Sequence, residues 1–296
     1  MRLVEIERHV ASMEELQRIV GAMRAIASMR MQEAVRALAS VRDYGGALAA
    51  AIHDALAITA EPTHGSNSGS DGSRHAETAP VSARPRPGNR AIVLFTSEHG
   101  FVGGFNQRLI EAVESDLLAT DALVIVGSRG AAFAAERGRA TAWTHPLATR
   151  LAGIPDTVRI LEEALLQRIA RNEIVRAEVV YSRHRSNGEL VIERRRLFPL
   201  ELAAARGPRR RLAPLHDLPP RELLERLTSE YMLAQLTEAA TEALAAENAA
   251  RFAAMESARD NVGRRLRTLR LDASRARQEE VTSELLELVT GELALT

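Results

Sequence analysis

Cysteine and lysine are both missing from this chain of 296 residues, and aromatic residues make up only 3% of it. The absence of cysteine excludes disulfides, thiolate metal sites and cysteine nucleophiles. The absence of lysine excludes Schiff-base chemistry and the lysine of a phosphate-binding loop. The shortage of aromatic side chains argues against a surface on which bases or sugars would stack.

The chain also lacks an excess of charge of one sign and a long apolar run. Its 39 acidic residues balance its 39 basic ones, so no overall field draws it to nucleic acid or to an anionic membrane. No apolar run approaches the ~20 residues of a membrane span, and the N-terminus has no apolar centre like that of a signal peptide. We therefore expect a soluble protein without nucleic-acid partners or direct membrane insertion. The triplets Arg194–Arg196 and Arg209–Arg211 are expected on exposed strand and loop faces.

Long helical patterns occupy both ends of the chain. From Leu3 to roughly Ile58, apolar residues recur at steps of three and four, which is typical of a coiled-coil seam. Gly21 interrupts this pattern at a cost of about 1 kcal/mol, and we expect a close neighbour to explain it. The second pattern runs from Pro220 to about Leu295 and would reach ~105 Å at ~1.5 Å per residue. Such a helix needs a partner, and the N-terminal helix is the obvious candidate.

The middle of the chain has an α/β pattern. Continuous apolar runs at 91–95 and 122–127 are typical of strands covered on both faces. Helical patterns follow these runs, and Asn187-Gly188 predicts the turn of a hairpin. Further helices are expected over the ranges 106–118, 130–137 and 155–171, where Pro155 suits a first turn.

These patterns predict an α/β fold plus a long coiled coil, in which antiparallel N- and C-terminal helices flank a Rossmann-like α/β domain. The stretch 61–89 is rich in glycine, serine and proline, so we expect a flexible loop whose His64 and His75 are solvated and bind no metal. The predicted divisions are a coiled-coil helix at 1–60, the loop at 61–89, the Rossmann-like domain at 90–200, a connector at 201–219 and a second coiled-coil helix at 220–296.

The stretch "EHGFVGGFN", Glu98 to Asn106, places glycines between a predicted strand and a predicted helix. Its pattern, G-x-x-G-G, differs from the dinucleotide fingerprint G-x-G-x-x-G. We interpret it as a tight structural turn, in which Gly100, Gly103 and Gly104 allow unusual dihedral angles and Asn106 caps the helix. A phosphate cradle is the alternative interpretation.

No catalytic motif such as H-E-x-x-H or G-x-S-x-G occurs in the sequence, so we expect no catalytic, metal or cofactor site in this chain. Two other hypotheses remain open on the residues alone. One is a Rossmann-like nucleotide- or ligand-binding protein with helical dimerisation arms. The other is a cytoskeletal-type coiled-coil adaptor that associates with itself.

Four segments, spread from end to end, resemble the gamma subunit of the rotary F-type ATP synthase. Gln17-Arg18-Ile19, Ala22-Met23 and Ala27 are similar to its "TQKITKAM" helix, and "TSEHGFVGGFN" is similar to its "TSDRGLCGGFN". Toward the C-terminus, "ENAARFAAMESARDNVG" resembles "SEHAARMMAMKAATDNA". The following "SRARQEEVTSELLELVTG" resembles "NKARQAAITQELTEIVGG". Departures such as Gly21, where the family prefers lysine, indicate a divergent branch, either a second-operon or a sodium-type copy.

The resemblance implies a central rotor shaft that couples ion translocation to ATP synthesis or hydrolysis and is not itself catalytic. It implies partners in the alpha and beta subunits of the head, the epsilon subunit and the c-ring, with ATP and magnesium bound by the beta subunits. It places the chain at the cytoplasmic face of the bacterial inner membrane. It also implies partner contacts at Met23, Arg277, Gln278, Thr282 and Glu284.

Overall fold

The computed structural model describes residues 3–60, 89–185, 187–200 and 216–293. Three predicted features lie outside these ranges: residues 61–88 of the loop predicted at 61–89, with His64 and His75; residues 201–215 of the connector; and the triplet Arg209–Arg211. The described elements are α1 (Leu3–Ala60), β1 (Arg90–Phe95), α2 (Phe105–Glu114), β2 (Ala122–Val126), α3 (Ser128–Glu136), β3 (Trp143–His145), the 3-10 helix η1 (Leu151–Gly153), α4 (Ile154–Ala170), β4 (Arg176–His184), β5 (Leu190–Phe198) and α5 (Pro220–Leu293).

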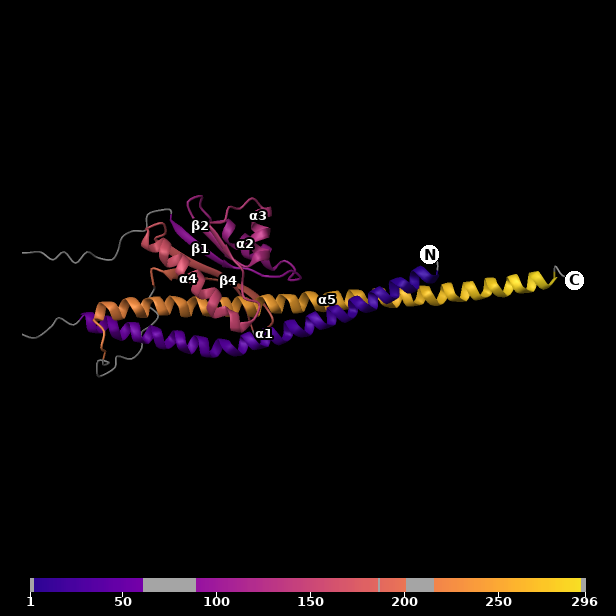
Figure 1. The fold of residues 1–296 in the computed structure, drawn as a ribbon, viewed down its shortest axis with the longest axis horizontal. Coiled ribbons are helices and arrows are strands. Elements are labelled where there is room, and N and C mark those ends of the chain that lie inside the picture. The colour runs from indigo at the N-terminus through magenta and orange to yellow at the C-terminus, as the bar shows by residue number, and fades with distance from the viewer. Residues whose placement is uncertain (1–2, 61–88, 186, 201–215, 294–296) are drawn as a thin grey trace, which may run out of the picture. The chain divides into compact units, whose positions relative to one another are not determined.

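The predicted helices and strands correspond closely to these elements. The two terminal patterns are α1, with 58 residues, and α5, with 74 residues, which run in indigo and in orange to yellow in Figure 1. The hairpin predicted around Asn187-Gly188 joins β4 and β5, and Gly188 has the positive φ of 84° that its turn requires. The short strand β3 was not predicted, because three residues give too little periodicity to recognise.

The chain divides into two compact units, each of which takes a part of α1 and a part of α5. We call residues 1–29, 101–103 and 248–296 the terminal unit, and residues 30–100 and 104–247 the sheet unit. Within the described ranges, no helix combines the length and apolar character needed to cross a membrane.

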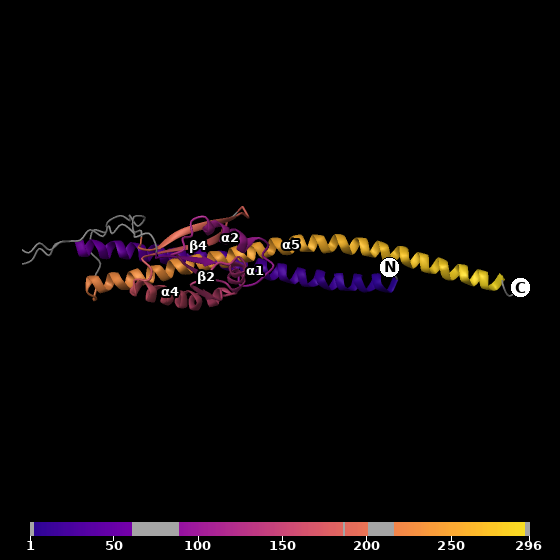
Figure 2. The ribbon, with the colours of Figure 1, turned by 90° about the horizontal axis from the view of Figure 1, so that it is seen from above.

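A mixed sheet of five strands forms the centre of the sheet unit, in the order β3-β2-β1-β4-β5. The strands β1 to β4 pair in parallel, and β5 pairs antiparallel with β4. Because neighbouring side chains of a strand point to opposite faces, Val93 and Phe95 face one layer while Ile92 and Leu94 face the other. The first layer contains α4, α5 and part of α1, and Figures 1 and 2 show α2 on the other side of the sheet from α4.

Within the sheet unit, α5 is buried around almost its whole circumference from Ala239 to Glu247. Five alanines in this stretch let the sheet, α4 and α1 approach the helix closely: Ala239, Ala240, Ala243, Ala245 and Ala246. A helix buried on all sides has no amphipathic stripe, so this stretch of α5 packs against several elements rather than along one seam.

In the terminal unit, buried apolar residues recur at intervals of seven on each helix. On α1 these include Ile6, Val20 and Ala27, and on α5 they include Met255, Val262 and Leu269, with Leu266 buried four residues after Val262. An interval of seven residues keeps one side of a helix toward its neighbour. The seam predicted from the spacing of apolar residues is therefore present at these positions.

Candidate functional site: exposed helix faces and an interior ion-pair network

Three ion pairs connect α1 to α5 in the terminal unit. Glu7 pairs with Arg277 at 2.5 Å, Glu14 with Arg270 at 2.6 Å, and Arg24 with Glu256 at 2.7 Å. From the first pair to the third, the residue number therefore rises on α1 and falls on α5. All six side chains remain at least a third exposed, so each pair is partly screened by water.

The predicted partner-contact residues of α5 lie on its exposed part. Arg277 keeps 65% of its side chain exposed even though it pairs with Glu7, and Thr282 donates a 2.7 Å hydrogen bond to the carbonyl oxygen of Gln278. Glu284 is exposed as well. Large apolar side chains interrupt this polar surface and are also open to solvent: Leu271, Val281, Leu285 and Leu286.

Met23, the predicted contact on α1, is half-buried next to Arg24. The same helix carries a second apolar stripe, in which Leu16, Ile19, Ile26 and Met29 are each at least 40% exposed. Their spacing of three and seven residues places them on one side of the helix. The terminal unit therefore offers polar and apolar surface that its own two helices leave uncovered.

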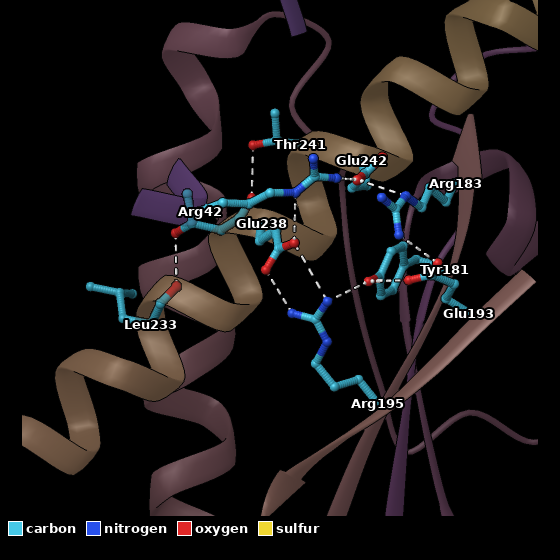
Figure 3. A network of polar contacts seen from close by, with 10 residues as sticks. Arg42, Tyr181, Arg183, Glu193, Arg195, Leu233, Glu238, Thr241 and Glu242 are labelled. Atoms are coloured by element: carbon cyan, nitrogen blue, oxygen red, sulfur yellow. Dashed lines mark hydrogen bonds and ion pairs between the residues drawn. The ribbon is translucent and has the colours of Figure 1, made fainter. Parts of the chain in front are cut away.

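The interior of the sheet unit holds a network of charged side chains that the sequence analysis missed, and Figure 3 shows it from close by. Glu238 of α5 accepts hydrogen bonds from Arg195 of β5 at 2.7 Å and from Arg42 of α1 at 3.1 Å. Burial disfavours the charged form of Glu238 and by itself would raise its pKa. The two arginines outweigh this effect and hold the pKa of the carboxyl below the ordinary value. One side chain thus connects three elements.

Glu242 lies one helical turn further along α5 and has 2% of its side chain exposed. It contacts Arg42 and the guanidinium of Arg183 on β4, the latter at 3.3 Å. Burial raises the pKa of Glu242 despite these arginines. Arg183 also donates to Glu193 of β5 at 2.8 Å, so the hairpin enters the same network.

Tyr181 completes the network on the face of the sheet. Its hydroxyl donates to Glu193 at 3.0 Å and accepts from Arg195 at 3.1 Å, and burial raises its pKa above the usual range. The interpretation of Arg194–Arg196 as a purely exposed face is therefore wrong for Arg195. Arg194 is also paired, with Asp116 at 2.7 Å. A sequence does not distinguish a solvated arginine from one whose partner lies on a distant element.

The glycine-rich turn after β1 is built differently from the prediction. The residue before α2 is Gly104, with an ordinary φ of −80° and no side-chain cap, so the capping role expected for Asn106 is wrong. Asn106 instead accepts from the Ser97 backbone N–H at 2.9 Å and donates to the Ser97 hydroxyl at 2.8 Å. Gly103 does take the left-handed conformation, with φ of 58°, while Gly100 and Gly104 do not.

Glu98, the first residue of the predicted turn, bonds to two later segments of the chain. Its carboxylate accepts from the backbone N–H and the hydroxyl of Ser128, the first residue of α3, at 2.9 and 2.7 Å. It also accepts from the backbone N–H of Leu147 at 2.8 Å. These bonds tie the turn to the start of α3 and to Leu147, so Glu98 has a structural role within the chain.

The close-approach explanation for Gly21 is also wrong. A Cβ atom built at Gly21 would meet no heavy atom within 4 Å. By contrast, Gly130 of α3 lies directly against Thr96, whose side chain would be 2.1 Å from an added Cβ. Among the described residues, no group of three or more histidine or acidic side chains is arranged to hold a metal ion.

Two long terminal helices with a mixed sheet between them, joined to the sheet by an ion-pair network, define the class of fold to which this protein belongs. A sequence model described as ATP synthase matches residues 2–295. The ATP synthase gamma chains of Streptomyces avermitilis and Streptomyces coelicolor are 31% and 30% identical to this chain, and each alignment covers 98% of this chain and 94% of the relative. The gamma chain of Frankia casuarinae is 28% identical, with 99% of this chain and 98% of the relative covered. The chain belongs to the ATP synthase gamma chain family.

Solved structures agree at the level of the fold. A chain of the Euglena gracilis mitochondrial ATP synthase (OSCP/F1/c-ring) superposes with a TM-score of 0.64 at 14% identity, with 99% of this chain and 94% of that chain covered. A chain from the central stalk/c-ring structure of the Tetrahymena thermophila enzyme gives a TM-score of 0.56 at 16% identity, with 81% and 99% covered. The terminal helices and the mixed sheet are therefore those of this fold.

Proposed function

We propose that this chain is the central rotor shaft of an F-type ATP synthase, a non-catalytic subunit that couples ion translocation to ATP synthesis or hydrolysis. The observation that carries the proposal is the match to gamma chains over nearly the whole length of both chains. A nucleotide-binding protein with dimerisation arms is not favoured, because the matched gamma-chain family covers residues 2–295. We likewise propose that the chain holds no metal or cofactor, and that ATP and magnesium bind to beta subunits.

The shaft we propose is an antiparallel coiled coil of α1 and α5. The support comes from the terminal unit. From one ion pair to the next, the residue numbers rise along α1 and fall along α5, and buried apolar residues recur at intervals of seven on both helices. The three ion pairs lie along the same side of the α5 seam and oppose sliding of one helix along the other, since a shift of one turn would separate every pair.

The sheet unit is proposed to be a Rossmann-like domain that turns together with the helices. Its four parallel strands in the order β3-β2-β1-β4 support the comparison. Glu238 and Glu242 connect α5 to α1 and to the hairpin, so a turning force applied to the sheet is transmitted through short charged contacts as well as through the core. The predicted divisions at 1–60, 61–89, 90–200, 201–219 and 220–296 remain part of this proposal.

The contacts proposed for the assembly follow from the exposed faces. Met23, Arg277, Gln278, Thr282 and Glu284 would meet the alpha and beta subunits of the head. We place the sheet unit near the epsilon subunit and the c-ring, with the complex at the cytoplasmic face of the bacterial inner membrane. A shaft whose sides differ contacts each surrounding beta subunit differently, and such differential contact is what lets a partner shift the nucleotide affinity of a site.

Replacement of both Arg277 and Gln278 by alanine tests this function in a complex reconstituted from purified subunits. We expect the variant to assemble and to lose most of its ATP-driven rotation, because the substitution removes the planar, charged guanidinium group of Arg277 from the partner contact. Glu7→Gln is the matched control: it breaks the same intramolecular ion pair at 2.5 Å but leaves Arg277 in place. Equal rotation and hydrolysis in the alanine variant and in the wild type would contradict the assigned contact.

A further inference from the structure

A groove of about 910 Å³ lies between α1 and the end of the β4–β5 hairpin, within the sheet unit. Its floor is apolar and comes from Met31, Val35 and Leu38 of α1. Because residues four and seven positions apart share one side of a helix, these three side chains form a continuous strip. Val35 is 44% exposed, so the strip is open to solvent at its middle, whereas Leu38 is buried at one end.

The edges of the groove carry four arginines. Arg36 and Arg42 come from α1, and Arg183 and Arg185 come from the end of β4 and the residue after it. Glu242 is the single acidic residue of the lining, and it is already in contact with both Arg42 and Arg183.

The other two arginines are not neutralised. Within the described part of the chain, neither Arg36 nor Arg185 pairs with a carboxylate, and the guanidinium of Arg36 donates only to the backbone oxygen of Gln32, at 3.2 Å. The nearby Glu189 accepts from the side chain of Asn187 at 3.3 Å. The groove therefore combines an apolar strip with an excess of positive charge at its edges.

We propose that this groove docks an acidic amphipathic helix of a partner subunit of the same assembly, so the inference rests on the proposed function. From Met31 to Arg42 the groove follows α1 for twelve residues, about 16 Å, which matches about three turns of a helix. The apolar side of such a helix would cover the strip, and its carboxylates would take bidentate hydrogen bonds from Arg36 and Arg185. A small inorganic anion would leave the strip exposed, and a basic helix would add like charge to the edges.

The absence of cysteine in the natural chain allows a direct test by site-specific cross-linking. Gln32→Cys carries a benzophenone photo-cross-linker into the complex reconstituted from purified subunits, and Arg171→Cys, on the exposed end of α4, carries the same group as a control. We expect the groove position alone to give a major adduct, and the peptide attached to it to be helical and rich in aspartate and glutamate. No groove-specific adduct, or an adduct with a basic segment, a lipid or a second copy of this chain, would overturn the proposal.

Charge reversal supplies the second measurement. Arg36→Glu with Arg185→Glu removes no carboxylate pair from the described chain, and we expect it to lower the yield of the Gln32→Cys adduct at least tenfold. The control, Arg171→Glu with Arg221→Glu, makes the same change of net charge at exposed positions and should leave the yield unchanged. If the wild type co-assembles with the head but the reversal changes nothing, this inference fails alone; if the wild type does not co-assemble, the proposed function itself fails.

Discussion

Arg24 of α1 and Glu256 of α5 form an ion pair at 2.7 Å, although 232 positions separate them in the chain. The same guanidinium lies over the ring of Phe252, 5.6 Å from its centroid. Both contacts join the two helices of the terminal unit at one place. The side chains of Arg24 and Glu256 are 34% and 41% exposed, so water weakens the charged contact.

A double-mutant cycle with Arg24→Gln and Glu256→Gln should therefore give a small coupling energy of about 0.5 kcal/mol in urea unfolding at low salt. We expect the coupling to shrink toward zero in 1 M sodium chloride, where the Debye length is ~3 Å. A coupling that grows with salt would mean that the pair is not electrostatic. Phe252→Leu in the Arg24→Gln background separates the contribution of the ring.

Replacement of Gly21 by alanine should stabilise the isolated chain by about 1 kcal/mol, because glycine is the poorer helix former and the added Cβ meets no atom within 4 Å. Gly103→Ala is the opposing control: its φ of 58° disfavours a Cβ, so we expect a loss of stability. Thermal unfolding of both variants measures the difference. A destabilised Gly21→Ala chain would mean that an unseen neighbour contacts this position.

Glu162 of α4 is a buried carboxylate that accepts a hydrogen bond from Ser229 of α5 at 2.9 Å. Burial raises its pKa above the ordinary value, and the Ser229 hydrogen bond offsets only part of that effect. The folded state therefore holds the proton more strongly than the unfolded state, and the charged form costs stability at pH above the folded-state pKa.

Glu162→Gln keeps an acceptor for Ser229 and removes the buried charge. We expect it to raise the free energy of unfolding at pH 8 by on the order of 1 kcal/mol. The gain should disappear below pH ~4, where the carboxyl of the wild type is neutral in both states. Urea titrations of both proteins at pH 8 and pH 4 measure this, and a gain that is independent of pH would rule out the charge as its cause.

Glu238→Ala should destabilise the chain by about 2 kcal/mol, because Arg195 and Arg42 lose the carboxylate that they share. The loss stays below the range for fully buried pairs, since a third of the Arg195 side chain is exposed. Amide hydrogen exchange should rise along β5 and in α1 near Arg42. Glu225→Ala on the same helix is the control: its pair with Arg221 is exposed, and little change is expected.

The elements with a strong internal period were predictable from the sequence. The apolar patterns of the terminal helices and of the runs in β1 and β2 predict these elements, because helices and strands place their apolar residues at characteristic intervals. The proline of α4 and the glycine of the β4–β5 turn were predictable for a similar reason, since both act through the local backbone. The resemblance of four segments to gamma chains supplied the family, and the match over residues 2–295 confirms it.

Side chains that act across the chain were not predictable. The sequence predicts a helix cap at Asn106, yet this side chain bonds to Ser97, because α2 begins two residues earlier than a cap at that position requires. Glu98 lies in the stretch predicted as a turn, and its bonds to Ser128 and Leu147 depend on the positions of residues that follow β2 and β3. The partner-contact residues on α5 remain predictions, since their partners are other chains.

The sequence by itself determined where this protein forms helices and strands and to which family it belongs, because periodicity, backbone preference and similar segments are written along the chain. Only the tertiary structure decided which charges are buried and which stay in water. Glu242 and Glu225 look alike in the sequence, but one lies beneath two arginines from distant elements and the other is exposed on a helix end. The physical reason is that the energy of a charge depends on the atoms packed around it, and packing brings together residues that the sequence keeps far apart.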